Sequence, residues 1–517
     1  MSSFGGLVYI LLSFPFLFLL LALIKIFHKL WWEPTRIQKL MTVQGIKGPS
    51  YRFIHGNSKE ISSMQKEAMS RPKSLSHDIF SYVQPHIYLW SRSYGKNFLQ
   101  WHGSRAQLVI TDPELCKEVL NNKDRTFVKT DIAEYMKKLL GDGLVTTESE
   151  KWGRVRKLAN SAFHGESLKC LVPATIASAE LMLERWKNHE GKEIEIFEEF
   201  RLLTSEVISR TAFGSSYLEG KSIFDKMMKL AILTFKNAFN TKIPMISNLF
   251  KTSDDIEAEN LEKGVRNSIL EIVKEREQKA MTKSGEEKSF GSDFLGLLLK
   301  AHHDVDINQR ITVDDLIDEC KTFYFAGQET TNSLLAWTMF LLALHTDWQE
   351  KARKEVLHLF GKQTPNLDGI SKLKTMGMII NESLRLYPPV VSIERKVARE
   401  VRLGELLVPA DLEIYIPALA LQHEPQFWGQ DLDLFKPEIF SEGVAKATNN
   451  SMAIFLPFGM GPRMCVGNNF ATTEAKIALA MILQHHTFTL SPNYVHSPFR
   501  LLTVRPQHGI QVKLHSL

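Results

Sequence analysis

Cysteine is scarce in this chain. Only four cysteines occur among its 517 residues, and they lie far apart, at Cys116, Cys170, Cys320 and Cys465. Four dispersed cysteines exclude a disulfide framework and a CxxC metal site, so a reducing compartment fits best. A single cysteine in a distinctive setting is therefore of more interest than the others, which we interpret as small buried apolar residues.

A strong charge of either sign is also missing. Lys and Arg total 63 against 58 Asp and Glu, and the basic residues are not gathered into a block with interleaved aromatics. Nucleic-acid binding is therefore not expected. The chain also lacks internal repeats, low-complexity tracts and long linkers, while 44% of its residues are hydrophobic. This composition predicts a large globular core and argues against disorder or a collagen-like fibre.

Charged residues are absent from the apolar run between Phe4 and Ile24. A run of roughly 20 apolar residues spans a hydrocarbon core of about 30 Å, whereas the apolar part of a signal peptide has only about 7 to 15 residues. Lys and Arg follow the run and none precedes it, which by the positive-inside rule places the rest of the chain in the cytosol. We expect a single-pass transmembrane anchor over 1–30, and a cleaved signal peptide is the alternative.

The rest of the chain divides into a short linker and one long domain. Gly45 to Pro49 is a cluster of residues that interrupt helix and strand, so we expect an interfacial hinge segment over 31–50 and a single domain over 51–517. The pattern of apolar residues predicts a mainly α domain with small β-sheets. Helices are expected over 149–163, 256–279, 312–344, 371–386 and 468–485, strands over 98–101, 107–111 and 401–417, and a surface loop over 281–293.

One cysteine stands in a distinctive setting. Residues 458–467 read Phe-Gly-Met-Gly-Pro-Arg-Met-Cys-Val-Gly, directly before the helix expected over 468–485. Glycines let the backbone approach a flat cofactor and donate amide hydrogens to a sulfur, and the start of a helix favours a thiolate at Cys465. Arg463 is placed to pair with a carboxylate of such a cofactor. The alternative is an ordinary glycine-rich loop with a buried cysteine.

The helix expected over 312–344 is unusually long, and it opens with a threonine three residues before an aspartate, the spacing of a capping box. Its centre, 326–331, reads Ala-Gly-Gln-Glu-Thr-Thr. A glycine and hydroxyl side chains in an apolar helix loosen its hydrogen bonds and leave room for oxygen and water. Glu329 and Thr330 carry groups that relay protons. On this segment alone, a kinked core helix with a surface-facing acid is an equal alternative.

Both segments resemble the signatures of the cytochrome P-450 superfamily. Residues 458–467 match its Phe-x-x-Gly-x-Arg-x-Cys-x-Gly pattern at every fixed position, and 326–331 match its Ala/Gly-Gly-x-Asp/Glu-Thr-Thr/Ser pattern. The resemblance implies the cytochrome P-450 fold, with haem b held by an axial thiolate from Cys465, which is thereby the metal ligand. It also implies that Glu329 and Thr330 are catalytic residues that deliver protons.

The resemblance extends to residues that hold the haem and the fold. Trp152 and Arg156 lie four residues apart, on a helix face that in the family points at the haem propionates. The residues that the resemblance further assigns to the cofactor are Arg463, Arg395, Phe458, Gly459 and Gly467. Glu382 and Arg385, a Glu-x-x-Arg pair before two prolines, are expected to support the thiolate loop. The chain departs from the family at Ile439, where an Arg or His usually completes this pair, which predicts weaker haem retention unless another group compensates.

The same resemblance implies the reaction and its partners. Residues 141–144, 209–214 and 381–389 are most similar to a plant group called the 72 clan, so we expect an enzyme of the endoplasmic reticulum membrane with its domain in the cytosol. It would take electrons from an NADPH-dependent flavoprotein reductase, use O2, and hydroxylate a hydrophobic terpenoid, steroid-like hormone or fatty acid. A basic helix face is either a docking surface for the reductase or an ordinary solvated face, and it comprises Lys151, Arg154 and Lys157.

The substrate and its pocket are the least determined features. Phe323, Ala326 and Val391 are tentative pocket residues, and each is equally plausible in the core. One alternative function is a thiolate-haem isomerase or dehydratase that needs no reductase, although such enzymes usually lack the acid-threonine pair. A second alternative is a haem-binding protein without turnover.

Overall fold

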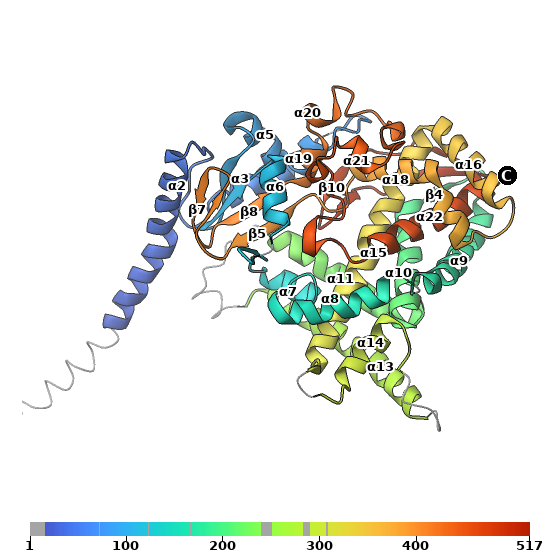
Figure 1. Ribbon diagram of the computed structural model, residues 1–517, viewed down its shortest axis with the longest axis horizontal. Helices are drawn as coiled ribbons and strands as arrows, with labels where there is room; N and C mark the ends of the chain where they lie inside the picture. Colours follow the sequence, from blue (N-terminus) through green and yellow to red (C-terminus); the bar gives the residue numbers. More distant parts are fainter. Residues whose placement is uncertain are drawn as a thin grey trace, which may run out of the picture.

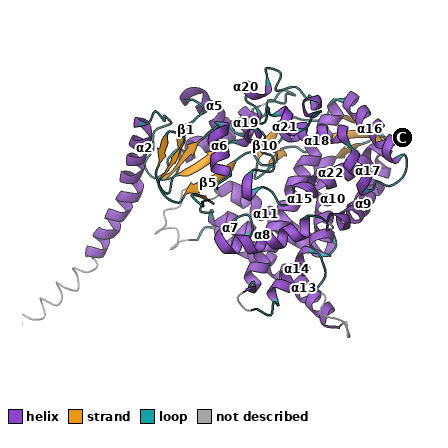
Figure 2. Ribbon diagram, in the orientation of Figure 1, coloured by secondary structure: helices purple, strands orange, loops and turns teal. Residues whose placement is uncertain are grey.

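The computed structural model describes residues 16–71, 73–122, 124–165, 167–238, 251–282, 290–306 and 309–517. Within these residues the chain is mainly helical, with its strands gathered in small sheets, as the sequence predicts (Figure 2). The largest sheet lies beside α2 (Glu33–Val43) at one side of the molecule, and helices make up most of the rest (Figure 1).

Helices from distant parts of the chain form one packed body. Its α-helices are α3 (Ser58–Ser70), α4 (Phe80–Val83), α5 (Pro85–Tyr94), α6 (Pro113–Leu120), α7 (Glu134–Leu140), α8 (Ser149–Phe163), α9 (Ser167–Trp186), α10 (Ile196–Phe213), α11 (Tyr217–Asn237), α13 (Ser253–Thr282), α14 (Phe294–His302), α15 (Val313–Leu344), α16 (Thr346–Phe360), α17 (Leu367–Lys372), α18 (Lys374–Leu386), α19 (Ala418–Gln422), α20 (Pro425–Trp428), α21 (Val444–Ala447) and α22 (Asn468–His485). Short 3₁₀ turns are η2 (Lys187–His189), η4 (Pro437–Phe440), η5 (Met452–Ile454) and η6 (Gly461–Arg463).

The described strands form one larger sheet and three smaller ones. The five-stranded sheet has the order β1-β2-β8-β5-β3, with β1 (Phe98–His102), β2 (Arg105–Val109), β8 (Glu413–Ile416), β5 (Ile393–Val397) and β3 (Phe127–Val128). The three-stranded sheet is β4 (Glu193–Glu195), β12 (Gln511–Ser516) and β9 (His486–Leu490), and the hairpins are β6 (Val401–Leu403) with β7 (Leu406–Val408) and β10 (Pro498–Arg500) with β11 (Val504–Pro506). Only β2 and β8 pair in parallel, among the described strands.

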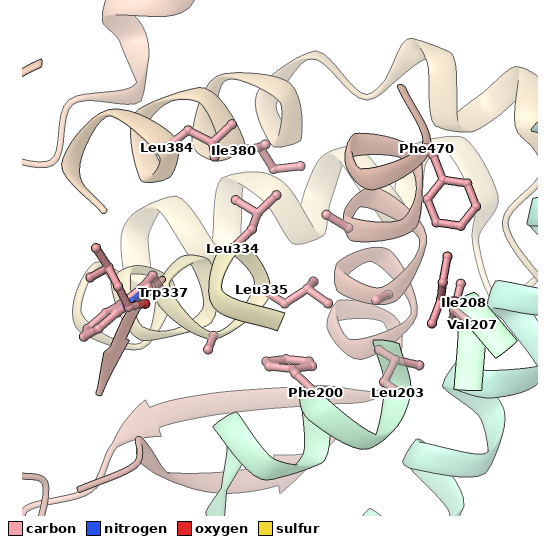
Figure 3. Close-up of a cluster of buried hydrophobic side chains, with 14 of the residues drawn as sticks. Phe200, Leu203, Val207, Ile208, Leu334, Leu335, Trp337, Ile380, Leu384 and Phe470 are labelled. Carbon is pink, nitrogen blue, oxygen red and sulfur yellow. The ribbon is translucent and has the colours of Figure 1, made fainter. Parts of the chain in front are cut away.

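The long helix α15 runs through the centre of this body because apolar residues cover most of its circumference. Figure 3 shows Leu334, Leu335 and Trp337 of α15 among side chains from α10, α18 and α22. Trp337 is fully buried, and its indole N–H donates to the carbonyl of Val504 at 3.0 Å. A helix that is apolar on nearly all sides is stable only inside a protein, so the composition of α15 accounts for its central place.

Element boundaries agree with the sequence where caps are strong. The predicted capping box opens α15: the Thr312 hydroxyl accepts from the Asp315 amide at 3.0 Å, and the Asp315 carboxylate accepts from the Thr312 amide at 3.0 Å. The helix expected over 371–386 is instead divided into α17 and α18, because Leu373 adopts a non-helical conformation with φ −68° and ψ 86°. The loop expected over 281–293 lies mainly on 283–289, outside the described residues.

The predicted anchor over 1–30 lies partly on residues 1–15, which are outside the described part of the chain. Residues 16–43 form one projecting helix that passes through a π-helical turn, η1 (His28–Trp32), into α2 (Figure 1). Among the described residues, no helix has both the length and the apolar composition that crossing a bilayer requires.

The predicted hinge segment, 31–50, is helical up to Val43 and then turns at Gly45, which has a φ of 85°. Hydrogen bonds fasten this turn to the body. The Gln44 side chain donates to the Leu407 carbonyl at 3.0 Å and accepts from the Leu407 amide at 2.6 Å. Beyond the turn, the Lys47 carbonyl accepts a hydrogen bond from the Leu99 amide in β1, so the segment lies against this strand.

Candidate active site

The thiolate loop, defined here as residues 458–467, closes on itself just before α22. The Cys465 amide donates to the carbonyl of Phe458 at 2.8 Å, which holds the two ends of the loop together. Gly461 has a φ of +72°, and a Cβ at this position would lie 2.3 Å from the carbonyl oxygen of Leu120 at the end of α6. Only glycine satisfies both conditions, so the signature glycine lets the loop pack against α6.

Cys465 is exposed, whereas Cys116 and Cys320 are buried. Cys116 and Cys320 are only 0% and 1% exposed, and burial raises the pKa of both thiols. The protein around Cys465 still removes enough water to raise its pKa, while a backbone hydrogen bond from Gly467 and the nearby Arg156 guanidinium oppose this shift. The thiolate, not the thiol, is the metal ligand, so these two opposing groups favour metal binding at Cys465.

Helix α8 supplies aromatic and cationic side chains to the thiolate loop. Arg156 donates to the carbonyl of Met464 at 2.6 Å, and the Arg463 guanidinium lies 4.2 Å from the centre of the Trp152 ring. Arg463 also forms an ion pair with Glu148 at the start of α8. The face of α8 that carries Trp152 and Arg156 therefore contacts the thiolate loop.

Arg463, Arg395 and Lys129 gather positive charge beside the loop. Arg395 is 5% exposed, and burial lowers its pKa to about 10, with Arg463 acting in the same direction and Glu148 opposing. Burial likewise lowers the pKa of Lys129 to about 7, with further lowering by Arg395 and Arg463. Arg463 thus lowers the pKa of both Arg395 and Lys129, and a bound anion would relieve this repulsion.

Sequence reasoning missed Lys129. In the antiparallel pairing of β3 with β5, Val128 lies opposite Lys396. The next residue, Lys129, therefore comes beside Arg395. The Lys129 amide also donates to the Glu148 carboxylate at 2.7 Å. No local pattern around Lys129 could have indicated this arrangement, which depends on residues more than two hundred positions away.

These residues fit a haem. Haem has an iron that accepts a thiolate and two propionate carboxylates that need positive partners. Cys465 offers an accessible sulfur, and the cations of Arg395, Arg463 and Lys129 exceed the negative charge of Glu148. A Cβ on Gly459 would meet no atom closer than 3.9 Å, so the backbone beside the sulfur leaves space for a flat ring.

The centre of α15 remains a continuous helix through 326–331. A Cβ on Gly327 would lie 2.6 Å from the Cδ1 atom of Ile208, so this glycine lets α10 pack closely on α15. The Thr330 hydroxyl donates to the carbonyl of Ala326 at 2.7 Å, within the helix. The helix is therefore continuous where the sequence predicts loosening, and Gly327 has the packing role that the alternative interpretation allows.

Glu329 is buried rather than surface-facing. Its carboxylate accepts from the Thr503 hydroxyl at 2.6 Å and lies 3.0 Å from the Arg505 guanidinium, and the Glu329 side chain is 1% exposed. Burial raises its pKa, while Arg505, Thr503 and Arg201 oppose the shift. Sequence reasoning missed Thr503 and Arg505, although a buried acid requires partners of this kind.

Glu382 and Arg385 form a fully buried ion pair, with both side chains 0% exposed. Arg385 donates to the two Glu382 oxygens at 2.7 Å each, and the Lys436 amide donates to the same carboxylate at 2.9 Å. Arg385 also donates to the Leu432 carbonyl at 2.8 Å. Ile439 only packs against the core, so a backbone amide supplies the compensation that its missing cation requires.

Comparison with known proteins agrees with this geometry. The family model described as Cytochrome P-450 matches residues 83–514. The chain is 59% identical over 508 residues to cytochrome P-450 CYP749A22 of Panax ginseng, covering 98% of this chain and 97% of that protein.

The chain belongs to the cytochrome P-450 family. It is also 40% identical to 7-deoxyloganic acid hydroxylase of Catharanthus roseus, over 95% of this chain and 96% of that protein. It is 41% identical to 11-oxo-beta-amyrin 30-oxidase of Glycyrrhiza uralensis, over 100% of this chain and 99% of that protein. This cytochrome P-450 is therefore an oxidoreductase of the monooxygenase class that binds haem through a cysteine thiolate.

The tentative pocket residues of this cytochrome P-450 have different surroundings. Phe323 is 6% exposed, and its ring stacks on Phe163 at 5.0 Å and lies 4.1 Å from Phe294, which favours a packing role over the predicted pocket role. Val391 is 1% exposed and also lies in the core. Ala326 is half-buried on the same turn of α15 as the acid-threonine pair.

The basic face of α8 is already partly engaged within the cytochrome P-450 itself. Lys151 forms ion pairs with Asp142 at 3.1 Å and with Asp315 at 2.6 Å. On the predicted basic face, Arg154 and Lys157 are exposed, whereas Lys151 is half-buried.

Proposed function

We propose that this cytochrome P-450 hydroxylates a hydrophobic terpenoid, using O2 and electrons from an NADPH-dependent flavoprotein reductase. The observation that carries the proposal is the thiolate loop, in which Cys465 is accessible and the guanidinium groups of Arg156, Arg395 and Arg463 lie nearby. The names of two relatives, 7-deoxyloganic acid hydroxylase and 11-oxo-beta-amyrin 30-oxidase, support an isoprenoid substrate. Steroid-like hormones and fatty acids are the other hydrophobic classes to test.

The cofactor in this proposal is haem b, with Cys465 as its axial ligand. Haem bound there supplies the activation of O2 that C–H hydroxylation requires. Trp152, Arg156 and Arg463 hold the thiolate loop and the propionate side of the ring. Arg395 completes this side, and Phe458, Gly459 and Gly467 shape the backbone around the sulfur.

Glu329 and Thr330 have separate roles in proton delivery. The pKa of the Glu329 carboxyl is raised by burial, so it holds a proton closer to neutral pH than an exposed glutamate does. The Thr330 hydroxyl donates to Ala326 within the helix, and its oxygen lone pairs remain able to accept a hydrogen bond. In this role the Glu329 carboxylate leaves Arg505, takes up a proton from water, and passes that proton toward the hydroxyl of Thr330.

The chain is proposed to be anchored in the endoplasmic reticulum membrane through residues 1–30, with the domain of residues 51–517 facing the cytosol. Support comes from exposed apolar side chains on the projecting helix, where Phe16, Phe18 and Phe27 are 69%, 71% and 59% exposed. Large exposed apolar surfaces mark membrane or protein contacts. Fractionation of cells that express the full chain and a variant lacking 1–30 tests this part of the proposal.

Reductase-coupled membranes that contain the full-length protein provide the functional test. Wild-type protein is expected to give the carbon monoxide difference spectrum of a thiolate-ligated haem, and Cys465→Ser is expected to lose it. A panel of terpenoids, steroids and fatty acids, read by mass spectrometry, is expected to yield a hydroxylated terpenoid only when NADPH and reductase are present. Product formation from a hydroperoxide without reductase would instead support an isomerase or dehydratase.

A further inference from the structure

A second group of metal-ligating side chains lies away from the thiolate loop. One oxygen of Asp78, one oxygen of Asp433 and a ring nitrogen of His423 lie within 4.8 Å of one another. All three residues line a cavity of about 420 Å³ that α5, α19 and α20 help to enclose. Asp78 precedes α4, His423 follows α19, and Asp433 lies in the loop between α20 and η4, so three separate segments meet here.

Two atoms of this group are buried without a hydrogen-bond partner, namely Nδ1 of His423 and Oδ1 of Asp433. His423 is only 6% exposed, and its Nε2 atom lies 3.2 Å from the Leu386 carbonyl. A carbonyl accepts only, so Nε2 carries the ring proton and Nδ1 carries the lone pair. This hydrogen bond to the second nitrogen is the arrangement that orients histidine ligands in metal sites.

The two carboxylates of the group also favour a cation. Asp78 and Asp433 repel each other, while Arg92 acts on Asp78 and Arg385 acts on Asp433 in the opposite sense. Among the described residues, no Lys or Arg forms an ion pair with either acid.

We propose that Asp78, His423 and Asp433 bind a divalent metal ion of the Zn²⁺ type. One imidazole nitrogen and two carboxylates are ligands that Zn²⁺ accepts at about 2.0–2.2 Å, and water from the cavity completes its coordination. The ion would replace the repulsion between two acids by attraction and satisfy both unpartnered atoms.

The site has a structural consequence for the Glu382–Arg385 pair. Arg385 donates to the carbonyls of Leu432 and Leu434, which flank Asp433 in the chain. A metal ion would tie this loop to the segment of Asp78 and so restrain the loop that Arg385 holds. Metal binding is therefore expected to stabilise the protein against unfolding.

A second cluster, Glu277, His302 and His303, provides an internal control. Here His303 already pairs with Glu277 at 2.7 Å, and His302 contacts the Ile311 carbonyl at 2.8 Å. The His303 side chain is 40% exposed, so this cluster lacks the burial of the first group and its zinc binding should be weaker.

The test uses the purified haem-containing protein after treatment with a chelator. Zinc is added alone, and bound zinc is measured by titration calorimetry and by elemental analysis after desalting. We expect about one equivalent in the wild type and in His303→Gln. Asp433→Asn and Asp78→Asn are expected to bind zinc at least about 10-fold more weakly, and to lose the zinc-dependent rise in melting temperature.

The carbon monoxide spectrum shows whether each variant is folded, so this test does not depend on the proposed substrate or reaction. Asp78→Asn changes a partly exposed side chain and serves as the second variant if Asp433→Asn does not fold. Three results would each overturn the proposal. They are wild-type zinc affinity in both Asn variants, loss of binding in His303→Gln alone, and no zinc binding by the wild type.

Discussion

Removing the cation beside Glu329 should expose the energetic cost of burying this acid. In Arg505→Met the Glu329 carboxylate keeps its hydrogen bond from Thr503 but loses the guanidinium at 3.0 Å. The two side chains are 1% and 12% exposed, so solvent screens their interaction little. Breaking a buried ion pair in this way lowers the free energy of unfolding by about 3–5 kcal/mol at neutral pH. The loss cannot exceed the cost of protonating Glu329, because a neutral Glu329 no longer needs a cation.

The same variant should change how stability depends on pH. Burial already raises the pKa of Glu329 above its usual value of 4.5, and loss of Arg505 raises it further. An acid whose pKa is higher in the folded state stabilises that state at low pH, and this contribution is lost as pH rises through the folded pKa. The unfolding free energy of Arg505→Met should therefore fall more steeply above pH 4.5 than that of the wild type.

Urea unfolding of the haem-containing protein at pH 5, 7 and 8.5, followed by the Soret band and by tryptophan fluorescence, measures both effects. Glu329→Gln and the double variant Glu329→Gln with Arg505→Met complete a double-mutant cycle. The double variant should recover at least half of the loss, because it leaves no unpaired charge. A loss below about 1 kcal/mol in Arg505→Met at pH 7, or a pH dependence equal to that of the wild type, would refute the reasoning.

Three further predictions concern buried positions. Gly327→Ala should lower the melting temperature, because overpacking against Ile208 costs about 1–3 kcal/mol and the helix gains only about 1 kcal/mol from alanine. Adding Ile208→Ala to this variant should restore the melting temperature. If the double variant still couples NADPH use poorly to product formation, Gly327 also shapes the oxygen site. Gly461→Ala should yield protein with little or no thiolate-haem spectrum, since its Cβ would lie 2.3 Å from the Leu120 oxygen at a φ of +72°. Burial raises the pKa of Glu474 well above its usual value, so Glu474→Gln should match the wild type in thermal stability at pH 6 and exceed it at pH 9.

The parts of the site that sequence could predict are those whose residues are close along the chain. The thiolate loop is contiguous, and Trp152 and Arg156 share a helix face because they are four residues apart. The bounds of α8 and α22 also follow from local patterns, and the structure has both as predicted. In these cases local geometry determines which side chains meet.

The parts that sequence could not predict depend on pairings between distant segments. Lys129 joins the cations through the β3–β5 pairing, and Arg505 reaches Glu329 from the hairpin of β10 and β11. A lysine after a valine and an arginine before a proline carry no local signal of such contacts. The packing partner of Gly327 is hidden for the same reason, because Ile208 lies on another helix.

Ile439 illustrates why a departure from a family pattern cannot be interpreted from the missing side chain alone. The sequence predicts an undersatisfied Glu382, since the expected third cation is absent. The Lys436 amide instead donates to Glu382, and three carbonyls of the following segments accept from Arg385. Because these are backbone groups, the pair depends on the conformation of the loop rather than on a particular side chain. Whatever restrains that loop, including the proposed metal site, therefore contributes to holding α18, the helix of Glu382, in place.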